Sequence, residues 1–105
     1  MKKVQIFESE YICTLDILNW HKNRKVDPKK VQKIKKAIKE QNYVEGIIYL
    51  AKYDNIYFCY DGIHRIRAVN ELFSHFDKSY KCVVDIIDYS ENNIQQRLEI
   101  LQKKL

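Results

Sequence analysis

The chain contains little glycine and almost no proline, with two glycines and one proline in 105 residues. This scarcity excludes collagen-like, proline-rich and flexible-linker proteins, which depend on these residues. Apolar residues make up 46% of the chain, which is enough for one modest hydrophobic core. The length therefore predicts a single domain, residues 1–105, and leaves little room for a second one.

A long apolar run is also lacking. No stretch approaches the roughly 20 residues that a membrane-spanning helix needs. The start, Met1-Lys2-Lys3 followed by Val-Gln-Ile-Phe-Glu, does not have the shape of a signal peptide. We therefore expect a cytoplasmic protein without a membrane partner.

Cysteine and histidine do not occur in metal-binding patterns. The three cysteines, Cys13, Cys59 and Cys82, form no C-x-x-C pair, and their number is odd. Each lies in an apolar stretch, so we interpret them as reduced thiols of the core. The three histidines are not spaced as zinc ligands, and no metal site is expected.

Positive charge is unevenly distributed along the chain. The net charge is +5, but residues 22–39 hold nine basic residues and only Asp27 as an acid, which gives this segment +8. Such a segment attracts nucleic acid or other anions, although it also fits a solvated helix face. The basic residues are Lys22, Arg24, Lys25, Lys29, Lys30, Lys33, Lys35, Lys36 and Lys39.

The pattern of apolar residues predicts strands and helices in alternation. Residues 4–7 and 11–18 are expected to be strands. Asp27 can cap a helix that starts at Pro28, runs over residues 28–41 and ends at Asn42 in a left-handed conformation.

Further along, residues 47–53 and 56–60 predict two strands joined at Asp54-Asn55. A helix is expected from Ile63 or His64, then a strand over 82–88 and a last helix over about 91–104. The apolar stripe of that last helix favours packing on the sheet or pairing with a second copy as a homodimer. The mixture indicates an α+β or α/β protein.

The segment most informative about chemistry is the turn between the second hairpin strand and the next helix. Asp61-Gly62 breaks the strand, and the helix opens with His64 and Arg65. The first N–H groups of a helix lack internal partners and attract anions, and arginine grips phosphate oxygens in pairs. The alternative is that Asp61 caps the helix and that both cationic residues are merely exposed.

This turn resembles the D-G-x-H-R-x-x-A signature of the ParB/sulfiredoxin-like superfamily, which Asp61, Gly62, His64, Arg65 and Ala68 match in register. Upstream, Val26-Asp27-Pro28 and residues 31–38 resemble the first helix of the family. Residues 37–48 resemble its S-I-x-x-x-G-x-x-x-P-I stretch, with Asn42 and Gly46 replacing a glycine and a proline. The resemblance covers about residues 11–88.

The resemblance implies an α+β fold with a mixed sheet and flanking helices, and a core over about residues 11–88. It also implies binding of a nucleoside di- or triphosphate, with Mg²⁺ as a candidate companion, and NTP hydrolysis or phosphoryl transfer as candidate activities. Asp61, Gly62, His64 and Arg65 would hold the phosphates, with Arg24 approaching from the loop before the first helix. Ile63 replaces the reactive cysteine of sulfiredoxins, so that activity is not expected, and no catalytic residue is identified.

Two other functions remain open at this point. The helix over 28–41, with Lys29, Lys33 and Lys36, fits a DNA- or RNA-binding or nuclease-like accessory protein. Tyrosines of the predicted strands would then stack on bases. A non-catalytic protein-interaction factor of a phage or mobile element is the third hypothesis, which no particular residue favours.

Overall fold

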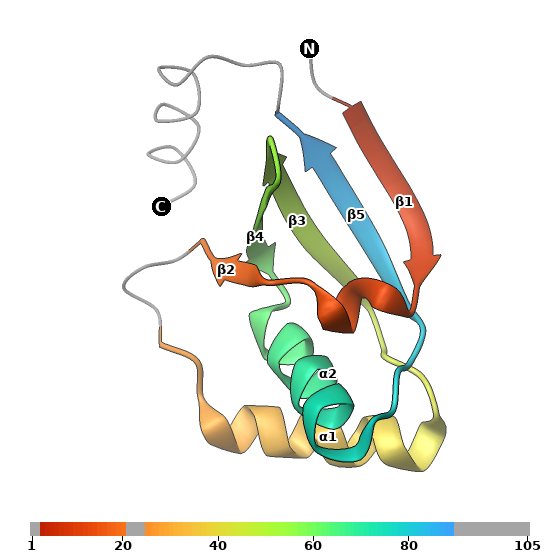
Figure 1. Cartoon of the computed structure of the whole chain (residues 1–105). Coiled ribbons are helices and arrows are strands. Elements are labelled where there is room, and N and C mark those ends of the chain that lie inside the picture. Colours follow the sequence, from red (N-terminus) through yellow and green to blue (C-terminus); the bar gives the residue numbers. More distant parts are fainter. Residues whose placement is uncertain (1–2, 21–24, 90–105) are drawn as a thin grey trace.

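The computed structural model describes residues 3–20 and 25–89, which fold into the strands and helices of an α+β protein (Figure 1). Its strands are β1 (Lys3–Ser9), β2 (Ile17–Asn19), β3 (Ile47–Tyr53), β4 (Ile56–Asp61) and β5 (Cys82–Asp88). Its helices are α1 (Pro28–Gln41) and α2 (Ile63–Phe76), and a short 3₁₀ turn, η1, covers Tyr11–Thr14. No described helix is long and apolar enough to cross a membrane.

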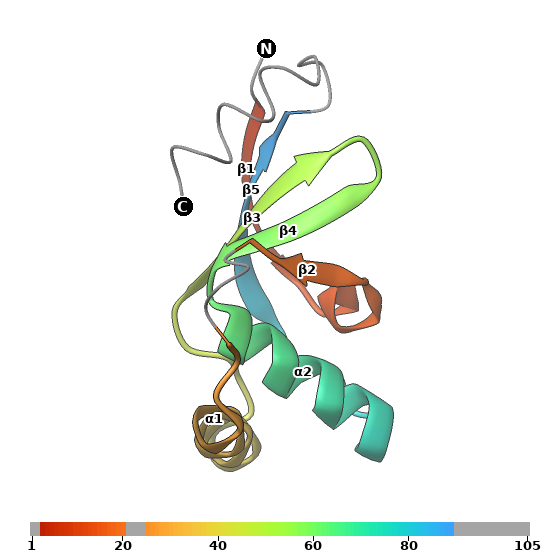
Figure 2. The same ribbon diagram turned by 90° about the vertical axis from the view of Figure 1, so that its left-hand side faces the viewer.

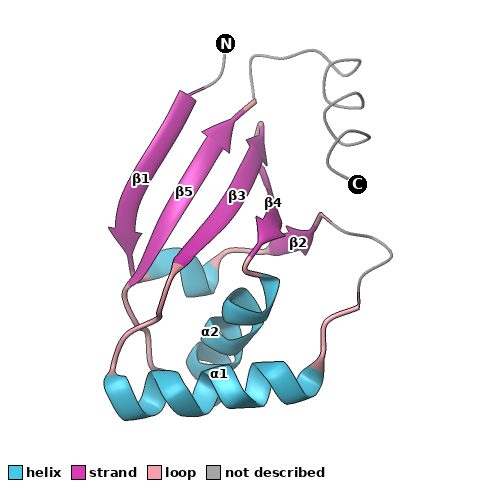
Figure 3. Cartoon of the chain, turned by 180° about the vertical axis from the view of Figure 1, so that it is seen from behind, coloured by secondary structure: helices cyan, strands magenta, loops and turns pink. Residues whose placement is uncertain are grey.

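The five strands form one mixed sheet in the order β1-β5-β3-β4-β2. β1 pairs with β5 and β3 pairs with β4 in antiparallel fashion, whereas β3–β5 and β2–β4 are parallel pairs. Both α1 and α2 lie beyond one end of the central strands, where α2 packs on α1 (Figures 1 and 3). This arrangement brings the end of β4 to the place where both helices begin.

Two apolar clusters lie on opposite faces of the sheet. The larger contains Ile48, Leu50 and Val84 of the central strands, together with buried residues of α1, α2 and η1. On the other face an aromatic group forms around Trp20, whose ring lies 6.0 Å from that of Tyr53. Figure 2 shows the twisted sheet in a view turned by 90° from Figure 1, with η1 and α2 on the same side of β1, β5 and β3.

Most predicted elements are confirmed. Asp27 caps α1, and Asn42 ends it with a φ of 64°. The β3–β4 turn lies at Asp54-Asn55, and α2 begins at Ile63. All three cysteines are buried and reduced. The expected helix over 91–104, with the dimer contact assigned to it, lies outside the described residues.

The predicted strand over residues 11–18 is wrong. Residues Tyr11–Thr14 form a 3₁₀ turn, and only Ile17–Asn19 is a strand. The Thr14 hydroxyl donates to the Tyr11 carbonyl at 2.7 Å, and adjacent Ile12 and Cys13 are both buried, which an alternating strand would not permit. The strand predicted over residues 4–7 is confirmed as β1, which pairs with β5, so the sheet extends beyond the 11–88 span expected for the core.

Candidate functional site

The start of α2 has no side-chain cap. β4 ends at Asp61, Gly62 turns the chain with a φ of 101°, and α2 begins at Ile63. Gly62 occupies the N-cap position, so Asp61 does not cap the helix as the alternative interpretation required. No acidic residue lies in the first turn. The positive end of the helix dipole and its first N–H groups are therefore not neutralised by a cap.

The start of α1 lies against the start of α2. Asp27 accepts a hydrogen bond from the Lys29 N–H at 3.0 Å, which caps α1. The Asp27 N–H in turn donates to Nε2 of His64 at 3.0 Å, across 37 positions of sequence. Because Nε2 accepts this bond, the ring proton of neutral His64 is on Nδ1. His64 therefore joins the two helix starts and keeps one donor for a ligand.

The guanidinium of Arg65 lies against both glycines of the chain. A Cβ atom at position 46 would lie 3.0 Å from Nη2 of Arg65 and 3.1 Å from Cζ. A Cβ atom at position 62 would lie 3.7 Å from Nη1. Both glycines have positive φ angles, 78° and 101°. Gly46 thus leaves the space that the planar guanidinium occupies, whereas Gly62 lies at ordinary contact distance from it.

These residues border a cleft of about 310 Å³. Two lysines of α1 face the end of β4 and the start of α2 across it. Among the described residues no carboxylate lies within ion-pairing distance of Arg65. The lining residues are Lys30, Lys33, Ile34, Asp61, Gly62, His64 and Arg65, of which three carry a positive charge and only Asp61 a negative one. The cleft is therefore suited to an anion.

A smaller cavity of about 140 Å³ shares Ile34 and Arg65 with this cleft and continues along α1. Its other lining residues include Ala37 and Ile38, which are apolar, and Gln41 and Glu45, which provide hydrogen-bonding groups. Arg65 thus lies between the positively charged cleft and a smaller cavity whose lining is partly apolar and partly polar.

The other lysines of α1 form two groups, one that contacts α2 and one that is exposed to solvent. Lys35 lies 3.7 Å from the carboxylate of Glu71, and Lys39 lies over the ring of Phe76, so both face α2. Lys29 and Lys36 are exposed and do not line the cleft. Among the lysines predicted to contact nucleic acid, only Lys33 lines the cleft. Lys30 also lines it, although the sequence predicts no role for this residue. Arg24 lies outside the described residues.

Cys59 supports the turn from beneath. Its thiol, fully buried in the sheet, donates to the Asp61 carbonyl at 3.3 Å. Burial raises the pKa of Cys59 to about 12, so the thiol stays protonated near neutral pH. It therefore has a structural role in holding the turn and is not a nucleophile.

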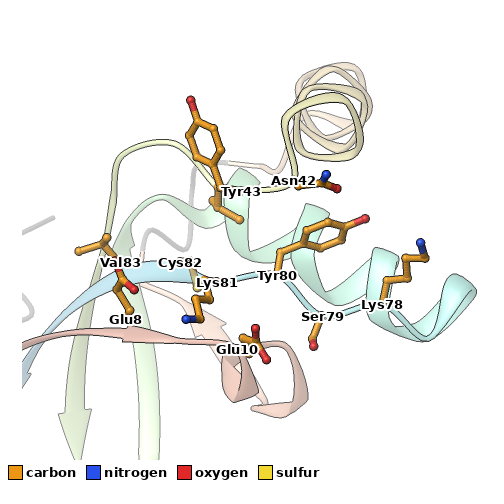
Figure 4. A pocket seen from close by; sticks show the side chains of 11 residues that line it. Glu8, Glu10, Asn42, Tyr43, Lys78, Ser79, Tyr80, Lys81, Cys82 and Val83 are labelled. Atoms are coloured by element: carbon orange, nitrogen blue, oxygen red, sulfur yellow. The ribbon is translucent and has the colours of Figure 1, made fainter.

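A cavity larger than this cleft lies elsewhere. It measures about 660 Å³ and is bordered by the end of β1, the residues after α1 and the segment that leads into β5 (Figure 4). Its lining combines Glu8 and Glu10 with Lys78 and Lys81, so the charges balance. None of the predicted site residues borders it. Size alone therefore does not identify the functional site.

Among the described residues, no group of three histidine, cysteine or acidic side chains is placed to hold a metal ion. Comparisons of the chain with protein-family models, curated proteins and solved structures found no match. Inference about function therefore depends on the residues of the cleft.

Proposed function

We propose that this chain is a ParB/sulfiredoxin-like module that binds the phosphates of a nucleoside di- or triphosphate in the cleft between α1 and α2. The observation that carries the proposal is the seating of Arg65 between Gly46 and Gly62, beside the uncapped start of α2. Arg65 donates from a planar fork that fits two phosphate oxygens, and the helix N–H groups donate from the adjacent side.

The remaining lining residues suit a phosphate chain. Lys30 and Lys33 supply two more positive charges from the opposite wall, and Nδ1 of His64 supplies a neutral donor. The adjoining cavity, with Gln41 and Glu45, offers polar groups to another part of the nucleotide. A magnesium ion that arrives with the nucleotide would take Asp61 as its protein ligand and phosphate oxygens as others.

Isothermal titration with CTP, ATP and ADP tests this proposal. Arg65→Ala is expected to weaken binding at least tenfold, and Lys30→Gln severalfold, because each removes a charge from the cleft. Lys36→Gln removes the same charge from the same helix outside the cleft and should bind as the wild type does. Absence of heat with all three nucleotides, or equal affinities for wild type and Arg65→Ala, would overturn the proposal.

Nucleic-acid binding is the second candidate, and one observation favours it. Lys29, Lys33 and Lys36 are all exposed and lie on one face of α1. Nucleic acid bound through such a face would lose affinity steeply as the salt concentration rises. The predicted stacking of bases on tyrosines is not supported at Tyr53, because its side chain is buried. Filter binding of DNA and RNA at two salt concentrations, with Lys29→Glu and Lys36→Glu, which lie outside the cleft, distinguishes it from the first candidate.

A further inference from the structure

The row of lysines on α1 joins the cleft at one residue. Lys29, Lys33 and Lys36 are spaced so that all three lie on the same side of the helix. Lys33 also lines the cleft, on the wall opposite Arg65 and His64. Lys35 and Lys39 do not belong to this row, since they face α2. Positive charge therefore runs from inside the cleft onto the open surface of α1.

The row extends farther than a free nucleotide requires. Lys29 and Lys36 are seven positions apart, which corresponds to about 10 Å along a helix. Neither borders the cleft, so a nucleotide held there leaves both without an anionic partner. Beyond Lys36 the same side of the helix presents Glu40, which is exposed and reverses the charge. A ligand that uses the whole row must carry further phosphates outside the cleft.

We propose that the cleft takes the terminal phosphate of a single-stranded nucleic acid, whose next phosphates lie beside Lys33 and then beside one of its two neighbours in the row, Lys29 or Lys36. This inference rests on the phosphate site proposed above and names its substrate class. A single strand fits because the cleft of about 310 Å³ accepts one chain end, and from Lys33 the row continues to one further lysine in either direction along α1. The cleft recognises the end, and the row adds affinity that does not depend on base sequence.

Fluorescence anisotropy with short labelled oligonucleotides tests this inference. DNA and RNA strands carrying a 5′-phosphate, a 3′-phosphate or no terminal phosphate are compared, so that the arms identify the polymer and the end. One phosphorylated form is expected to bind at least tenfold more tightly than its unphosphorylated counterpart. Arg65→Ala should remove that difference.

The double variant Lys29→Gln/Lys36→Gln separates the row from the cleft. It should weaken oligonucleotide binding and lower the salt slope by about 0.7, since a strand that leaves the cleft at Lys33 contacts one of these two lysines and each phosphate contact on a single strand contributes about 0.7. Titration with CTP, ATP and ADP should be unchanged. Lys78→Gln/Lys81→Gln, which loses the same charge at the distant large cavity, is the matched control and should behave as wild type.

The outcomes distinguish this inference from the proposed function. If nucleotides bind but oligonucleotides with and without a terminal phosphate bind equally, recognition of ends is overturned and the phosphate site stands. Equal losses of oligonucleotide affinity in the two double variants would likewise overturn the inference, because the net positive charge of the protein would then explain the affinity. If neither nucleotides nor oligonucleotides bind, both proposals fail. Circular dichroism of each variant verifies that the fold is retained.

Discussion

The two helices begin side by side but in opposite ways. α1 starts with a proline, which has no N–H to satisfy, and with an aspartate whose carboxylate accepts the Lys29 N–H. α2 starts after Gly62, with no side chain that caps it. The first arrangement stabilises the fold locally. The second gives up that stabilisation and leaves donors at the cleft, as expected where a ligand replaces the cap.

The strongest test of the α2 start is Gly46→Ala. Alanine must adopt a φ of 78°, and its Cβ must lie 3.0 Å from the Arg65 guanidinium. We expect a loss of about 1 to 3 kcal/mol in the free energy of unfolding, together with weaker nucleotide binding. Urea denaturation and isothermal titration measure the two effects.

A double-mutant cycle with Arg65→Ala then separates strain from contact. Without the guanidinium, Gly46→Ala should cost less, with a coupling of at least about 0.5 kcal/mol, because only the backbone strain remains. If Gly46→Ala costs the same in both backgrounds, the two residues do not act together.

His64→Ala breaks the connection between the helix starts. The Asp27 N–H loses its acceptor in a partly buried place, which should reduce the free energy of unfolding by about 1 to 2 kcal/mol. His64→Gln, whose amide oxygen is an acceptor at similar reach, should recover part of this loss. Thermal and urea denaturation of the three proteins provide the comparison, and equal losses for Ala and Gln would argue against the bond.

Asp27→Ala addresses the capped start alone. Loss of the carboxylate cap should cost about 1 kcal/mol of stability. Nucleotide affinity should change little, since Asp27 does not line the cleft. A large loss of affinity at unchanged stability would contradict the division of roles between the two helix starts.

The smallest expected effect concerns the thiol beneath the α2 start. Since burial raises the pKa of Cys59 to about 12, the folded protein holds almost no thiolate at pH 8. The same cause raises the pKa of Cys82 to about 12. Native protein should therefore not react with a thiol reagent, whereas denatured protein should show all three thiols. Rapid native labelling of Cys59 would mean that the turn opens.

Local signals in the sequence were sufficient for most of the fold. Asp27-Pro28, Asn42 and the Asp54-Asn55 turn act through their own backbone preferences, so each could be located without tertiary information. The segment 11–18 could not, because its β-branched residues fit a strand locally. Its 3₁₀ turn depends on burying Ile12 and Cys13 together against α2 and the sheet.

The candidate site was predictable only in part. The Asp61-Gly62-x-His64-Arg65 pattern identified the turn and the residues at the start of α2. Lys30 was not distinguished, because its side of α1 is fixed by how that helix packs. The role of His64 as an acceptor from Asp27, and the seat that Gly46 provides for Arg65, join residues distant in sequence and have no local signal.

The seat of Arg65 has a thermodynamic consequence. A side chain already held against two backbones gives up little rotational freedom when an anion arrives, so less entropy opposes binding than for a loose surface arginine. A lysine at position 65 would lack the planar guanidinium that packs against the backbone of Gly46 and Gly62. It would keep the positive charge but would not hold the side chain in one conformation. Under the proposed function, part of the binding free energy at Arg65 is thus prepared when the chain folds.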